Sequence, residues 1–155
     1  MPLLSIGLLA HGCGPMPSEQ AFDAIEVGAP FKQVVVRSSG DSRFVVDGQS
    51  ETQKTGSFKI AKSDFSKLVA RLDPYRSEAK PTAQAWDVFA TSPCPAGAPR
   101  QTDAGTVFVR WTGPDYDQTL VADLGCDYRR HETRNREILA LFKAMPLPES
   151  GRPLP

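Results

Sequence analysis

The chain has 155 residues, and 40% of them are hydrophobic. This suffices for one packed core and argues against a second of similar size. Eighteen basic residues balance eighteen acidic ones, so the formal net charge is zero and no overall field attracts nucleic acid or an anionic membrane. No period of about 20 to 50 residues recurs, which argues against a repeat fold.

The N-terminal segment begins with an apolar run from Leu3 to Ala10, which is shorter than the roughly 20 residues of a membrane-spanning helix. A run of this length predicts an export signal. It ends in Ala10-His11-Gly12-Cys13. This segment resembles the lipobox of bacterial lipoproteins, in which small residues precede the cysteine that becomes the lipidated N-terminus.

The resemblance implies a signal peptide over residues 1–13 and a lipid attached to Cys13. Gly14, in place of the aspartate that favours inner-membrane retention in such lipoproteins, points to the outer membrane. Two other interpretations of Cys13 stay open at this stage, namely a free thiol and secretion with cleavage nearby but no lipid. Glycine, proline and polar residues follow Cys13, so we expect a linker over residues 14–30.

The folded domain is expected over residues 31–148, with a disordered tail over 149–155. Valine-rich runs at Phe31–Arg37 and Arg43–Asp47 flank Ser38-Ser39-Gly40-Asp41, which predicts a β-hairpin. A third strand is expected at Gly56–Ile60, where apolar and polar residues alternate.

A helix is expected next. Its apolar stripe has the spacing i, i+3, i+4 and i+7, and Pro74 follows it. The stripe consists of Phe65, Leu68, Val69 and Leu72. We interpret it as core packing.

The segment from about Pro81 to Gly105 is rich in glycine and proline and predicts a long connection. Within it, residues 86–89 include Trp86 and Phe89, which favour an extra short strand or a plug at one edge of the core. A second hairpin is expected from Thr106–Trp111 and Gln118–Asp123 around a turn-forming loop.

A closing helix is expected over Thr133–Met145, where apolar residues recur at helical spacing before Pro146. Strands and helices therefore come in blocks. This order predicts an α+β fold in which an antiparallel sheet of about five strands, in two hairpin-containing blocks, has both helices on one face. The other face, or a free edge strand, would be open to a partner.

Three short patterns extend this interpretation to a family. They are Phe44-Val45-Val46-Asp47-Gly48, Thr55-Gly56-Ser57-Phe58-Lys59-Ile60 and Asp64-Phe65-Ser66-Lys67-Leu68-Val69. Together with the later hairpin and Leu124-Gly125-Cys126, they resemble an uncharacterised bacterial domain of unknown function found in predicted envelope lipoproteins. The resemblance covers residues 31–148 and implies location and fold. The cysteine-containing segment that this family often carries in its first hairpin is absent here, since residues 37–42 contain no cysteine.

Two cysteines, Cys94 and Cys126, remain once Cys13 is assigned to a lipid. In an oxidising compartment they are expected to form a disulfide. The alternative makes Cys94 a catalytic thiol, which would need a neighbouring base or cation. No metal-binding spacing of cysteine and histidine is present in the sequence.

Five basic residues gather before and within the last helix. Arg129, Arg130 and Arg134 are the candidates to contact an anion or a partner, although local ion pairs on a solvated face explain the same pattern. Asp115 and Asp117 share the second hairpin loop with Tyr116. They are either turn residues or carboxylates that could act with His131.

The sequence therefore favours a tethered cell-envelope module facing the periplasm that binds another protein or a cell-wall component. No motif predicts catalysis, a metal, a cofactor or nucleic-acid binding. The alternative is a small envelope hydrolase that uses His131 with Asp115 or Asp117.

Overall fold

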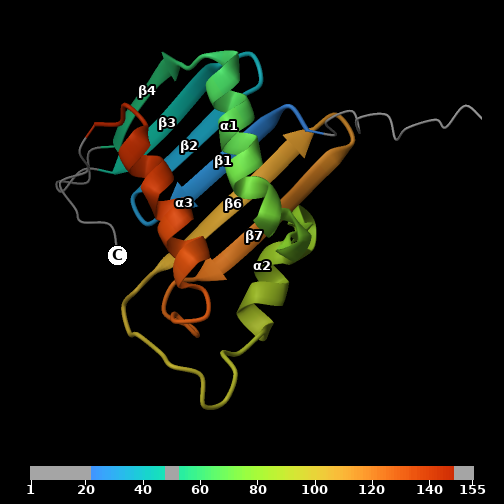
Figure 1. Cartoon of the computed structure of the whole chain (residues 1–155), viewed down its shortest axis with the longest axis vertical. Helices are drawn as coiled ribbons and strands as arrows, with labels where there is room; N and C mark the ends of the chain where they lie inside the picture. The colour runs from blue at the N-terminus through green and yellow to red at the C-terminus, as the bar shows by residue number, and fades with distance from the viewer. Residues whose placement is uncertain (1–21, 48–52, 149–155) are drawn as a thin grey trace, which may run out of the picture.

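A computed structural model of the chain describes residues 22–47 and 53–148. Over these ranges seven strands form one antiparallel sheet in the order β4-β3-β2-β1-β6-β7-β5 (Figure 1). The strands are β1 (Ala24–Ala29), β2 (Lys32–Arg37), β3 (Asp41–Asp47), β4 (Gln53–Lys59), β5 (Lys80–Pro81), β6 (Thr106–Gly113) and β7 (Tyr116–Asp123).

Three α-helices accompany the sheet in the described ranges: α1 (Lys62–Leu72), α2 (Thr82–Thr91) and α3 (Glu132–Ala144). A short 3₁₀ helix, η1 (Asp73–Glu78), continues directly from α1. The expected α+β class, with an antiparallel sheet, is confirmed. The sheet is larger than the expected five strands, and there is a third helix.

Strand β1 corrects the expected domain boundary. Residues 14–30 were expected to be a linker before a domain that starts at residue 31, yet β1 occupies Ala24–Ala29 and pairs with β2 on one side and β6 on the other. Ile25 and Val27 are fully buried, so this short segment lies at the centre of the sheet. The expected signal peptide, the rest of the expected linker and the tail lie outside the described residues.

Helix α2 corrects the expectation of a strand around Trp86. Residues 82–91 are helical, and Ala85 is buried while Trp86 is 47% exposed. The Trp86 and Phe89 rings, three residues apart, meet edge to face with centroids 6.2 Å apart, as neighbours at i and i+3 on a helix do. The helical spacing outweighs the strand preference of the aromatic residues.

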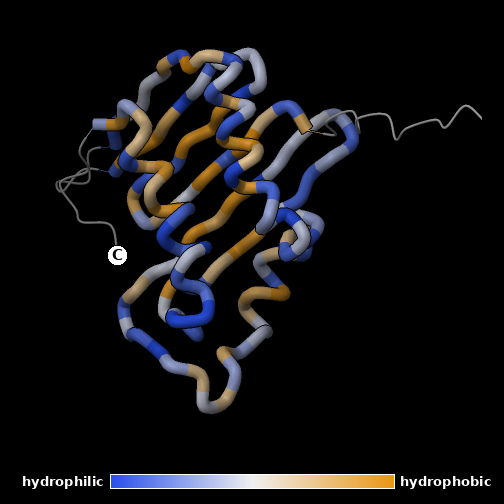
Figure 2. The backbone as a smooth tube through the Cα atoms, viewed as in Figure 1, coloured by the Kyte–Doolittle hydropathy of each residue, from blue (hydrophilic) through white to orange (hydrophobic). Residues whose placement is uncertain are grey.

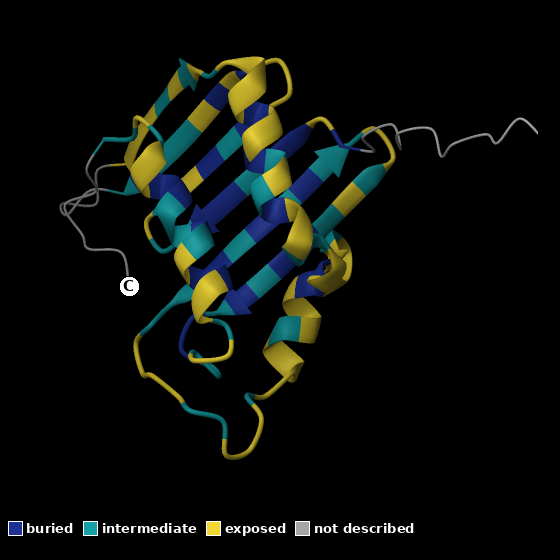
Figure 3. Ribbon diagram, viewed as in Figure 1, coloured by how far each residue is buried: buried dark blue, intermediate teal, exposed yellow. Residues whose placement is uncertain are grey.

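Helices α1 and α3 lie across the same face of the sheet, which we call the inner face (Figure 1). Hydrophobic residues run through the middle strands (Figure 2), and the buried residues gather beneath the two helices (Figure 3). The core on this face consists of Phe22, Ile25, Val27, Val34, Val36, Phe65, Leu68, Leu72, Ala79, Val107, Val109, Trp111, Leu120, Ala122, Leu124, Ile138, Leu141 and Phe142.

The opposite face, which we call the outer face, carries the alternate side chains of the same strands. Since side chains point to alternate faces along a strand, the register places Glu26 beside Val35 and Arg110 and Arg43 beside Val35 and Ser57. Most of these side chains are polar. The outer face therefore has the composition of a surface that contacts water or a partner.

Candidate functional site

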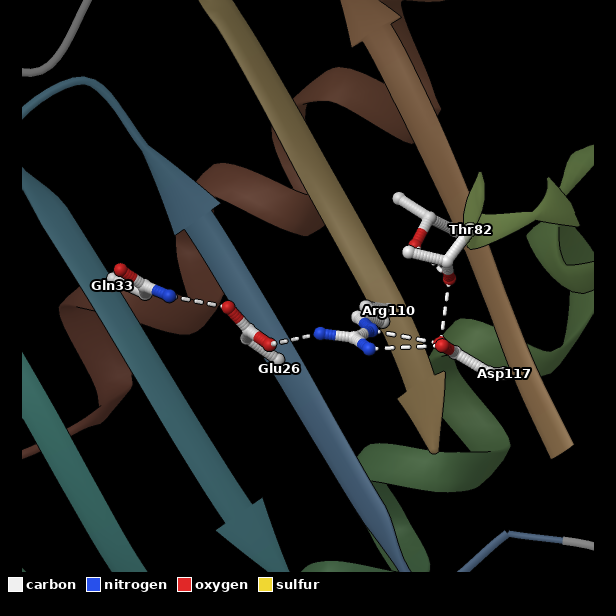
Figure 4. A network of polar contacts seen from close by, with 6 residues as sticks. Glu26, Gln33, Thr82, Arg110 and Asp117 are labelled. Atoms are coloured by element: carbon white, nitrogen blue, oxygen red, sulfur yellow. Dashed lines mark hydrogen bonds and ion pairs between the residues drawn. The ribbon is translucent and has the colours of Figure 1, made fainter. Parts of the chain in front are cut away.

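A chain of polar contacts crosses the outer face at the middle of the sheet (Figure 4). At its centre Arg110 of β6 donates from Nε to Asp117 Oδ1 at 2.7 Å and from Nη2 to Asp117 Oδ2 at 2.9 Å. The third nitrogen, Nη1, lies 3.7 Å from Glu26 Oε2 on β1. One guanidinium thus connects three strands, because Glu26 and Arg110 are directly opposite each other in the register.

The chain of contacts continues at both ends. Gln33 Nε2 on β2 donates to Glu26 Oε1. At the other end Thr82 Oγ1, in the first turn of α2, donates to Asp117 Oδ1 at 2.6 Å and lies 2.8 Å from Thr119 Oγ1. We call Gln33, Glu26, Arg110, Asp117, Thr82 and Thr119 the outer-face network.

The electrostatics of this network hold its central pair in the charged form. Hydrogen bonding from Arg110, followed by that from Thr82, lowers the pKa of Asp117. The hydrogen bond to Asp117, together with the charges of Asp117 and Glu26, raises the pKa of Arg110 despite partial burial. A carboxylate that is already ionised and doubly bound is a poor proton acceptor at neutral pH. The network therefore fixes α2 on the sheet, and it explains the position of Asp117 without catalysis.

An aromatic cluster lies next to the network. Trp86 of α2 packs edge to face against Phe108 of β6, with ring centroids 5.8 Å apart. Phe108 in turn covers Gly28 of β1, since a Cβ built at Gly28 would lie 2.0 Å from the Phe108 ring. The absence of a side chain at residue 28 thus allows Phe108 to lie against the sheet and support Trp86.

The structure does not bring Arg129, Arg130 and Arg134 together as an anion site. Arg134 is buried, with 9% of its surface exposed. Its Nη1 donates to Glu78 at 2.9 Å, and its Nε and Nη2 donate to Asn135 at 3.2 Å. Glu78 and Asn135 therefore occupy the guanidinium of Arg134, which agrees with the interpretation of local ion pairs rather than with an anion site.

The two neighbouring arginines are differently placed. Arg129 lies over the ring of Tyr128, 5.8 Å from its centroid, and Arg130 is exposed. Both remain accessible, but without Arg134 they do not form a convergent cluster.

The residues of the alternative hydrolase are also kept apart. Asp115 and Asp117 lie at the start of β7, and His131 follows its end at the start of α3. An eight-residue strand separates its two ends by about 23 Å. Moreover, the Asp117 carboxylate is on the outer face, whereas α3 packs on the inner face.

The charged groups that shift the pKa of His131 do not include Asp115 or Asp117. Partial burial, and then the positive charge of Arg134, lower the pKa of His131 despite the opposing effects of Glu78 and Asp127. These neighbours belong to the structural cluster around Arg134. The geometry therefore does not assemble a His131–Asp115 or His131–Asp117 pair.

The expected disulfide between Cys94 and Cys126 is present, with Cα atoms 5.6 Å apart. It joins the segment after α2 to the turn after β7. The same two segments share the backbone hydrogen bond from Gln101 N to Gly125 O at 2.9 Å. Asp123 Oδ1 accepts from the backbone N–H groups of Gly125 and Cys126, at 2.7 and 3.2 Å. Since Cys94 is bonded, it is not a free catalytic thiol in this structure. Cys13 lies outside the described residues.

Within residues 22–47 and 53–148, no group of three or more metal-ligating side chains comes together. Over the same ranges, no helix combines the length and the apolar composition needed to cross a membrane.

Comparisons with known proteins supply no relative. No family model matches the chain, and neither the curated proteins nor the solved structures include a match. The functional argument therefore rests on the residues described above.

Proposed function

We propose that this protein is a lipid-anchored module of the bacterial cell envelope that faces the periplasm and binds an envelope protein or a cell-wall component through the outer face of its sheet. The observation that carries the proposal is the disulfide between Cys94 and Cys126. Structural disulfides persist in oxidising compartments and are rare in the bacterial cytosol. The disulfide thus supports export.

The anchor is proposed from the N-terminal sequence. The apolar run before Cys13 supports an export signal, and the lipobox-like segment supports acylation of Cys13. Two or more acyl chains give a stable membrane attachment, whereas one alone binds only marginally. Gly14 after the cysteine supports the outer membrane as the destination.

The binding surface is proposed from the contrast between the two faces of the sheet. The inner face is covered by α1 and α3 (Figure 1). On the outer face, α2 reaches only the side of β7 and β6, through Thr82 and Trp86, and polar side chains are exposed on β2, β3 and β4. An antiparallel sheet with one uncovered polar face offers a surface on which a partner can bind.

The test is metabolic labelling with radioactive palmitate in a bacterial host, followed by fractionation. The wild-type chain should incorporate label and sediment with membranes, and Cys13→Ser should do neither. The Cys94→Ser/Cys126→Ser variant is the control, because it keeps Cys13 and should still be labelled. Equal labelling of wild type and Cys13→Ser, or an unlabelled wild-type chain in the soluble fraction, would refute the anchor.

A further inference from the structure

A polar hollow of about 500 Å³ lies where β2, β3 and β4 run side by side. Three of its lining residues carry cations, one from each strand: Arg37 at the end of β2, Arg43 on β3 and Lys59 at the end of β4. Asp41 is the only carboxylate among the lining residues, and Ser42 and Ser57 also line it. We call this feature the cationic hollow.

The charges of the cationic hollow are not balanced from within. Lys59 Nζ lies 3.3 Å from Asp41 Oδ1, so one cation and the one carboxylate neutralise each other. Arg37 and Arg43 make no ion pair within 4.0 Å among the described residues. The hollow therefore keeps two excess positive charges in a protein whose net charge is zero.

Three other arginines of the domain are already engaged in ion pairs with carboxylates. Arg71 pairs with Glu137, Arg110 with Asp117 and Arg134 with Glu78. Arg37 and Arg43 instead present open guanidinium groups toward one cavity from adjacent strands. Hydrogen bonding from Ser39 and then from Lys59, with a further contribution from the charge of Arg37, lowers the pKa of Asp41. Part of this lowering therefore comes from cations that an incoming anion would also meet.

We propose that the cationic hollow binds a phosphate group through Arg37, Arg43 and Lys59. Guanidinium groups donate two parallel hydrogen bonds to phosphate oxygens, and an ammonium adds a third charged donor. A tetrahedral anion offers oxygens in several directions, which suits donors that come from three strands. The Ser57 hydroxyl, on the strand next to Arg43, is a further donor.

Two sources could supply this phosphate. The described chain begins at Phe22, which packs against Tyr116 of β7 and Arg76 of η1, on the other side of β1 from the hollow. Eight residues lie between Cys13 and Phe22, and the nine Cα–Cα steps between the two span at most about 32 Å. A lipid headgroup would therefore be within reach if the anchor is correct, and a soluble phosphate ester is the other source. The inference rests on the proposed binding role and names its ligand class, whereas the site itself does not depend on lipidation.

The experiment uses the full chain carrying Cys13→Ser, so that no lipid tether contributes. One arm titrates inorganic phosphate by calorimetry, and the other measures sedimentation with phosphatidylglycerol vesicles, with phosphatidylcholine vesicles as the reference. Arg37→Gln/Arg43→Gln should weaken binding by about tenfold or more, because two charge-assisted interactions are lost. The matched control is Arg136→Gln/Lys143→Gln, which removes the same charge from exposed positions on α3 and should bind as the parent does.

A second variant should change the affinity for phosphate in the opposite direction. Asp41→Asn removes the competing carboxylate and should tighten binding by about fivefold. Loss of the ion pair between Asp41 and Lys59 should not impair folding, because both side chains are largely exposed. Binding in the phosphate arm alone assigns a soluble ester, and binding in the vesicle arm assigns a lipid headgroup.

Three outcomes would overturn the inference: no binding in either arm, equal losses in the test and control pairs, or weaker binding by Asp41→Asn. Each of these can occur while Cys13 is still labelled with palmitate, and unlabelled Cys13 can coexist with phosphate binding. Failure of the inference is therefore distinguishable from failure of the proposed anchor.

Discussion

The two faces of the sheet are built from alternate residues of the same strands, yet they differ in composition and in exposure. On β2, Val34 and Val36 are buried on the inner face, whereas Gln33 and Arg37 are exposed on the outer face. The inner face is apolar and closed by two helices. The outer face is polar and in large part open. The charged side chains of the outer face can therefore change without loss of the core.

The largest difference between the faces should appear when one apolar side chain is truncated on each. Trp111 is fully buried on the inner face, and Trp111→Ala should lower the free energy of unfolding by about 3 to 5 kcal/mol. Val35 is partly exposed on the outer face, and Val35→Ala should cost less than about 1 kcal/mol. Urea denaturation measures both, and equal losses would show that the outer face also belongs to the core.

Loss of the disulfide should lower the free energy of unfolding almost as much as Trp111→Ala does. Cys94→Ser/Cys126→Ser opens a loop of about 33 residues and should lower the free energy of unfolding by about 3 to 4 kcal/mol. A reducing agent should lower the stability of the wild type by a similar amount and leave the variant unchanged. If the variant were as stable as the wild type, the disulfide would not constrain this domain.

An intermediate effect is expected where an outer-face ring touches the sheet backbone. Gly28→Ala places a Cβ against the Phe108 ring and should lower the free energy of unfolding by about 1 to 3 kcal/mol through overpacking. The double variant Gly28→Ala/Phe108→Ala removes the clash, so the added cost of Gly28→Ala should largely disappear in that background. An unchanged cost would place the strain elsewhere in β1.

The smallest effect is expected in the outer-face network. Asp117→Asn should lower the free energy of unfolding at neutral pH by less than about 1 kcal/mol, because the pair with Arg110 is partly exposed. Since the pKa of Asp117 is held below its ordinary value of 3.8, its contribution is complete above that pH and is lost as the pH falls below it. The stability difference between wild type and variant should therefore shrink in acid. A difference that grows in acid would contradict this assignment.

Local sequence signals predicted much of this fold. The valine runs and turn residues around Ser39 and Gly40 predicted the β2–β3 hairpin, and the stripe from Phe65 to Leu72 predicted α1. The two leftover cysteines predicted the disulfide. In each case the determining residues lie close together in the sequence, or are the only candidates of their kind.

The rest depends on contacts between distant segments. β1 has only Ile25 and Val27 as an alternating apolar pair, and its central place follows from pairing with β6 some 80 residues later. The outer-face network requires the registers of β1, β6 and β7 together, and no short motif encodes that. Arg134 looked exposed in a run of basic residues because its partner, Glu78, lies 56 residues away.

The most direct test of the central claim is the intact mass of the protein extracted from cell envelopes without reduction. If the protein is exported and anchored, we expect a chain that begins at Cys13, carries acyl groups and retains the Cys94–Cys126 disulfide. An unmodified chain that keeps residues 1–12, recovered in the cytosol with its thiols reduced, would contradict the account.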